Sequence, residues 1–94
     1  MMPKHIATMP TYTMPTVSLN GSPASDLLQQ QLKVLRAIDA LENALSEAVP
    51  NGRDYQYAPE TYATARDEHA AAWASLRQIK DRAHALAYHL AEKR

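Results

Sequence analysis

Cationic and aromatic side chains recur on one side of a predicted C-terminal helix. Trp73, Arg77 and Lys80 are separated by four and three residues, a spacing that keeps them on one helix face. Planar guanidinium groups suit phosphates, and an indole ring suits a base or a cation. This combination is typical of a site for a nucleotide-like anion. The alternative is a solvated face whose long side chains cover a packed tryptophan. Lys33 and Arg36 of the preceding helix are further candidate phosphate contacts. The full row is Arg66, Trp73, Arg77, Lys80, His84 and Tyr88.

A second group of candidate binding residues lies between two predicted helices. This segment, residues 51–57, combines a glycine turn with an arginine, an acid and two tyrosines, whereas a passive linker would be rich in Ser, Gly, Lys and Glu. Rigid scaffolds commonly present binding residues on such loops. The alternative is structural, with the arginine and the acid paired and a tyrosine capping the core. The candidate contacts are Arg53, Asp54, Tyr55 and Tyr57.

Two further residues complete the candidate ligand site. His69 falls on an apolar seam of the C-terminal helix, where we expect either a core histidine hydrogen-bonded across an interface or a polar group in a pocket between chains. Tyr12, in the N-terminal segment, is an additional ring for stacking against a base.

The sequence lacks the residue patterns of catalysis. There is no cysteine, no glycine-rich phosphate loop and no Gly-x-Ser-x-Gly turn. The Glu68-His69 step lacks the second histidine, four residues on, that a helical zinc site uses. We therefore expect a non-enzymatic protein with no cofactor and no metal.

Composition narrows the classes of partner. Ten Lys and Arg balance ten Asp and Glu in 94 residues, which disfavours binding to duplex nucleic acid. The absence of cysteine excludes disulfides and thiolate zinc sites. No apolar run reaches the roughly 18 residues of a membrane span, and the N-terminus lacks a secretion signal. We expect a cytoplasmic protein.

An N-terminal arm is predicted over residues 1–24. Four prolines interrupt this segment and push it out of the helical region, so it should be extended or disordered. One interpretation is a solvated tail. The other is an arm packed on a helix or a neighbouring chain, because the segment is rich in apolar side chains for a tail. These are Ile6, Met9, Tyr12, Met14, Val17 and Leu19.

Two helices follow, over residues 25–48 and 59–92, joined by a loop over 49–58. Ser22 or Ser25 could cap the first helix, Pro23 suits its first position, and Gly52 could close its C-terminus in the left-handed region. Apolar residues repeat every seven positions on both helices, the period of coiled-coil packing. The fold class is therefore all-α, an antiparallel helical hairpin. The rows are Leu27-Val34-Leu41-Ala48 and Gln31-Ile38-Leu45, then Tyr62-His69-Leu76-Ala83-Leu90 and Ala65-Ala72-Ile79-Leu86.

The helices differ in length, about 35 Å against about 50 Å. A tight hairpin would place Ala48 near Glu60 and Asp26 near Arg82, which leaves Leu86 and Leu90 to be covered by the arm or by another chain. Two helices also rarely bury enough apolar surface to fold alone. We expect a homo-oligomer, dimer or higher, that forms a helical bundle.

The loop and its flanking helices resemble a group of small phage- and prophage-encoded helical-hairpin proteins. The resemblance covers roughly residues 30–90 and is carried by Asn51-Gly52-Arg53-Asp54-Tyr55, the preceding Ala48-Val49-Pro50, and the later Arg66 and Glu68-His69. It implies an inhibitor of bacterial anti-phage immunity, a class that includes oligomers that sequester nucleotide signals without cleaving them.

Three functions are therefore open. The first is sequestration of an anionic nucleotide-like immune signal in pockets between chains. The second is a protein-binding inhibitor or adaptor that presents a helix face or the N-terminal arm to a host protein. The third is assistance in virion assembly.

Overall fold

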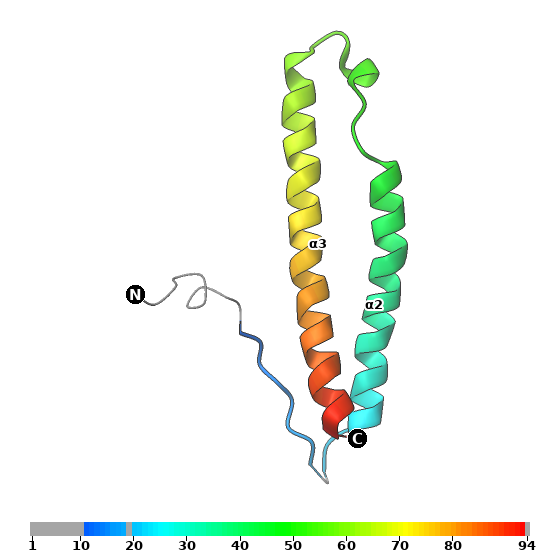
Figure 1. Ribbon diagram of the computed structural model, residues 1–94, viewed down its shortest axis with the longest axis vertical. Coiled ribbons are helices and arrows are strands. Elements are labelled where there is room, and N and C mark those ends of the chain that lie inside the picture. The colour runs from blue at the N-terminus through cyan, green and yellow to red at the C-terminus, as the bar shows by residue number, and fades with distance from the viewer. Residues whose placement is uncertain (1–10, 19, 94) are drawn as a thin grey trace, which may run out of the picture.

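The computed structural model describes residues 11–18 and 20–93. Its elements are α2 (Ala24–Glu47), a short 3-10 turn η1 (Gly52–Tyr55) and α3 (Glu60–Lys93). The two helices pack antiparallel as a hairpin (Figure 1). The predicted all-α hairpin is confirmed, and each helix end lies one residue from its predicted position. Neither helix is long and apolar enough to span a membrane within the described residues.

The ends of α2 differ in detail from the sequence expectation. Pro23 precedes the helix with φ −63° and ψ 152°, and its carbonyl accepts the backbone N–H groups of Asp26 and Leu27. No side chain caps this end, so the predicted serine cap is wrong. At the other end the Ala48 N–H donates to the Leu45 carbonyl. Gly52 has no positive φ and begins η1, so the predicted left-handed closure is also wrong.

The hairpin register is the main correction. Leu90 is fully buried in a cluster with Leu28 and Ala87, and Lys80 pairs with Glu42. The start of α2 therefore lies beside the end of α3, and the connection climbs past the end of α2 to the top of α3 (Figure 1). The prediction that Leu86 and Leu90 lack a partner within the hairpin is wrong, because the connection is long enough to shift the register.

The hairpin buries one apolar row of α3 and leaves much of another exposed. Leu76, Ala83 and Leu90 are buried against α2, whose own buried residues include Leu28 and Ile38. Three large apolar side chains of the flanking rows remain exposed, at 37% for Val34, 49% for Leu41 and 55% for Ile79. The packing of α2 on α3 therefore satisfies about half of the predicted heptad pattern.

The described part of the N-terminal arm packs on the hairpin. Residues 11–18 form no helix or strand and run beside the C-terminal end of α3 (Figure 1). Met14 and Pro15 share a hollow with Leu86 and Leu90, and His89 Nε2 lies 3.2 Å from the Pro15 carbonyl oxygen. The arm thus covers part of the α3 end. Ile6, Met9 and Leu19 lie outside the described residues.

Candidate functional site

Three predicted site residues meet in one hollow beside the middle of the hairpin. Trp73, Arg77 and Lys80 line it from successive turns of α3, and the volume of the hollow is about 290 Å³. This is close to the lower size limit of small-molecule sites. The remaining lining residues are Glu42, Asp81 and His84. Lys33 and Arg36, the predicted contacts from α2, do not line it, and α2 contributes the carboxylate of Glu42 instead.

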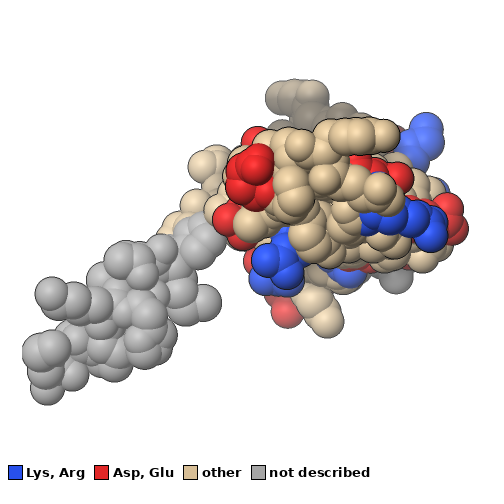
Figure 2. All heavy atoms as spheres, turned by 90° about the horizontal axis from the view of Figure 1, so that it is seen from above, with Lys and Arg blue, Asp and Glu red and all other residues tan. Residues whose placement is uncertain are grey.

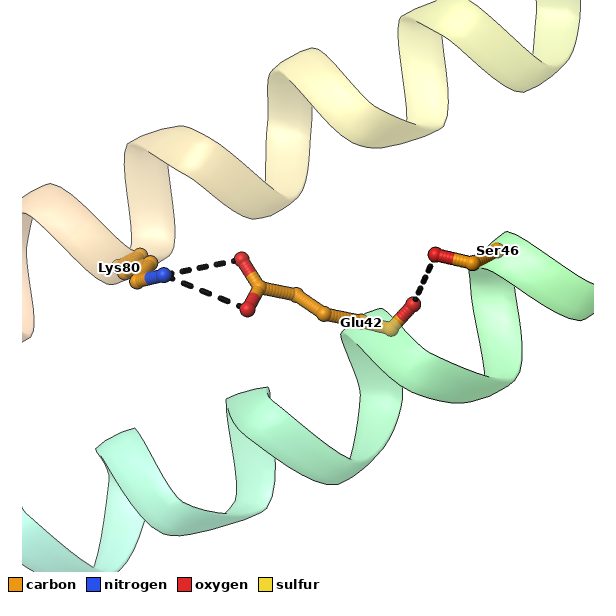
Figure 3. A network of polar contacts seen from close by, with 3 residues as sticks. All are labelled: Glu42, Ser46 and Lys80. Atoms are coloured by element: carbon orange, nitrogen blue, oxygen red, sulfur yellow. Dashed lines mark hydrogen bonds and ion pairs between the residues drawn. The ribbon is translucent and has the colours of Figure 1, made fainter.

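Lys80 is already paired within this hollow. Its Nζ donates to both carboxylate oxygens of Glu42, at 3.0 Å and 3.3 Å, and the Ser46 hydroxyl donates to the Glu42 backbone carbonyl at 2.9 Å (Figure 3). Both paired side chains are about one-third exposed, so the pair stabilises the fold by at most about 1 kcal/mol. Among the described residues, Arg77 is therefore the unpaired cation of this hollow.

Trp73 is held by a hydrogen bond within its own helix. Its indole Nε1–H donates to His69 Nε2 at 3.1 Å, one turn earlier in α3. Because Nε2 accepts, a neutral His69 carries its proton on Nδ1. This partner lies on the same helix, so a hydrogen bond of His69 across an interface between chains stays a prediction. The bond between Trp73 and His69 holds the indole in place as part of the lining of the hollow.

The interhelical loop forms a separate aromatic cluster with the start of α3. The rings of Tyr55 and Tyr62 lie 5.9 Å apart, tilted by 37°, and the Arg66 guanidinium sits 5.0 Å from the centre of the Tyr62 ring. This contact is a cation–π interaction. Arg66 is thus directed to the loop end of the hairpin and not to the Trp73 hollow.

Arg53, Asp54 and Tyr57 project from this loop into solvent. The Asn51 side-chain oxygen accepts the Arg53 backbone N–H at 3.0 Å and stiffens the turn. The only ion pair in the described part of the chain joins Glu42 and Lys80, so the expected Arg53–Asp54 pair is not formed. Tyr57 is fully exposed and caps nothing, whereas Tyr55 is half-buried against Tyr62.

The ten predicted site residues therefore fall into three groups along one chain. The loop group and the Trp73 hollow lie on different stretches of α3, a helix of about 50 Å. Tyr12 belongs to the arm, whose next three residues line a hollow with Leu86 and Leu90 near the C-terminal end of α3, the end opposite the loop. A single hairpin does not bring these groups together.

Sequence reasoning missed two residues of the hollow, Glu42 and Asp81, whereas His84 belongs to the predicted row of α3. Glu42 carried a signal, because it continues the heptad row of Leu28 and Leu35 and is the first charge on it. A carboxylate on an otherwise apolar row needs a partner across the helix interface, and Lys80 provides it.

The surface charge is mixed. Seen from the end of the hairpin, basic and acidic side chains are interspersed (Figure 2), as the balance of ten Lys and Arg with ten Asp and Glu predicts. Within residues 11–18 and 20–93, no three His, Cys, Asp or Glu side chains cluster closely enough to hold a metal ion.

Comparison with protein families, with curated proteins and with solved structures gives no match for this chain. The resemblance to phage helical hairpins therefore stays a prediction from the loop residues, and the geometry has to carry the functional argument.

Proposed function

We propose that this protein acts by binding and not by catalysis, as a homo-oligomeric helical bundle that sequesters an anionic, ring-bearing molecule of the nucleotide type. The observation that carries the proposal is the convergence of Trp73 and Arg77 on one hollow, with the indole fixed by His69. A fixed indole offers a stacking surface, and a neighbouring guanidinium offers paired donors to a phosphate.

The charges of the hollow limit the ligand it would accept. Lys80 is neutralised by Glu42, and Asp81 lies at the same hollow. Beyond the Glu42–Lys80 pair, a highly charged polyphosphate would therefore meet one arginine and one carboxylate, in a hollow without net positive charge. The hollow favours a flat ring with a single phosphate or phosphodiester group. A ligand larger than this hollow would need contacts from a second copy.

Trp73 makes the proposal directly testable, because it is the only tryptophan in the chain. We expect adenosine monophosphate or a cyclic dinucleotide to quench its fluorescence saturably and to be recovered intact after heating. Arg77→Ala should weaken this binding about tenfold or more, since a charged hydrogen bond is lost. Arg36→Ala removes the same charge outside the hollow and should leave affinity unchanged. If millimolar nucleotide changes neither the fluorescence nor the melting temperature, the proposed ligand class is excluded.

The Glu42–Lys80 pair supplies a second test with the opposite sign. Glu42→Gln removes the carboxylate that occupies Lys80, so it should raise the affinity for an anion by roughly three- to tenfold. Glu47→Gln, an exposed substitution on the same helix, should change nothing. Isothermal titration with adenosine monophosphate measures both, and weaker binding by Glu42→Gln would contradict the proposed role of Lys80.

A protein partner is the second candidate, and a separate observation favours it. On one face of the hairpin Leu28, Leu32 and Leu35 line an apolar hollow with Ala87 and Tyr88. A groove between two helices suits the apolar side of a third helix, here one from a host protein. Tyr88→Asp should abolish such capture and leave nucleotide binding intact, which separates the two candidates.

A further inference from the structure

One face of the hairpin is apolar and unpartnered within the part of the chain that the structure describes, and we call it the free face. Leu27 and Gln30 of α2 line one hollow with Arg82 and Leu86 of α3, so the rows that contain them converge on the same side. The hollow of Leu32 and Tyr88 lies on the other side. The free face comprises Leu27, Val34, Ala37, Leu41 and Ala44 of α2, and Ala65, Glu68, Ala72, Ser75, Ile79 and Arg82 of α3. It ends at Leu86, which is buried beside Met14 and Pro15 of the arm.

Large and small side chains occupy different halves of the free face. Leu41 and Ile79 each directly precede a member of the Glu42–Lys80 pair, so they lie at the same height on the hairpin. Toward the loop end, beyond the last turn of α2, the face of α3 carries Ala72 and Ala65. The half of the face with Leu41 and Ile79 thus presents large side chains. The half with Ala65 and Ala72 presents small ones, which a second helix can approach closely.

The free face is complementary to the free face of a second copy whose α3 runs in the opposite direction. A two-fold axis beside Ser75 places Glu68 of each copy opposite Arg82 of the other, because each lies seven residues from Ser75. The same axis brings Ala72 of each copy close to Ile79 of the other, a small side chain against a large one. An isologous interface requires this reciprocity, in which each contact occurs twice.

We propose that a second copy of this chain docks on the free face, with its α3 antiparallel to the first α3 and the two-fold axis at Ser75. Charge complementarity selects this occupant, since Glu68 and Arg82 are about 21 Å apart along one helix and cannot pair within a chain. Leu41 then packs beside Ala72 of the second copy, which covers exposed apolar surface of both helices. The arm on Leu86 marks the edge of the contact.

The inference rests on the oligomeric part of the proposed function and is independent of the ligand. If the chain dimerises but nucleotides leave its tryptophan fluorescence unchanged, the proposed ligand is wrong and the proposed interface stands. If the chain is a monomer that binds nucleotide, the proposed interface is wrong and the proposed ligand class stands.

Charge reversal tests the pairing. We expect the full chain to dimerise in sedimentation velocity over about 1–100 µM. Glu68→Arg should weaken the dimer about tenfold or more, because the introduced guanidinium would then face Arg82 of the other copy at both ends of the interface. The double variant Glu68→Arg/Arg82→Glu should restore wild-type affinity. A monomeric wild type, or a double variant no better than the single one, would overturn the proposal.

A single engineered cysteine tests the register, because the chain has none of its own. Ser75→Cys places a thiol from each copy at the axis and should give a disulfide-linked dimer under mild oxidation. Ala70→Cys is equally exposed on another side of α3, about 15 Å from its counterpart in the other copy along the helix. That separation exceeds the reach of a disulfide, so it should stay monomeric on a non-reducing gel. Equal cross-linking of the two variants would refute the register.

Discussion

Replacing Leu90 by alanine is expected to lower the free energy of unfolding by about 3 kcal/mol. Leu90 is the one large side chain, among the described residues, that has no exposed surface. It packs with Leu28 and Ala87 where the two helices begin and end. Truncation removes buried methyl groups and leaves a cavity that two helices cannot close without sliding. Urea unfolding followed by far-UV circular dichroism measures the change.

The size of this effect matters because the core is small. Eight apolar residues are buried in the described part of the chain, and a small domain has a free energy of unfolding of only a few kcal/mol. Tyr88→Ala is the matched control, since Tyr88 lies two residues away on α3 and is 74% exposed. It should cost well under 1 kcal/mol. Equal losses from the two substitutions would mean that α2 does not cover Leu90 in solution.

Leu90 also shows what sequence reasoning could and could not establish. The repeat of apolar residues every seven positions predicted both helices to within one residue, because periodicity is a local property of the chain. It did not predict the register. Both rows of α3 are equally suitable for packing, and sliding α2 along α3 by whole heptads preserves the match between the apolar rows. The register depends on the path of the loop, which lies along the start of α3 because Tyr55 packs on Tyr62.

The candidate site divides in the same way. Trp73, Arg77 and Lys80 could be grouped from sequence because one helix fixes their spacing. Glu42 could be recognised as a charge on an apolar row, but it could not be assigned to Lys80, because that pairing depends on the register. Tyr12 and Arg53 were joined to the site by residue type alone, and neither lines the hollow of Trp73. Residues on different elements can be assigned to one site only when the packing between those elements is known.

The second large effect concerns the arm. Met14→Asp should lower the free energy of unfolding by about 1–2 kcal/mol, because it removes a half-buried apolar side chain and places a carboxylate beside Leu86. Thr16→Asp introduces the same charge two residues away at an exposed position. It should change stability by less than about 0.5 kcal/mol. Urea titrations of the two variants at equal protein concentration make the comparison.

The difference between these two substitutions shows whether the arm packs on the hairpin or is solvated. Solvated tails tolerate a new charge at any position, so equal and small effects would show that residues 11–18 do not pack in solution. A loss specific to Met14 would show that the arm is part of the fold. In that case the arm shields Leu86 and Leu90, which α2 covers only in part, and it limits how far a second copy can extend along α3. The arm would then act on assembly as well as on stability, since anything that displaced Met14 would expose apolar surface beside the proposed interface.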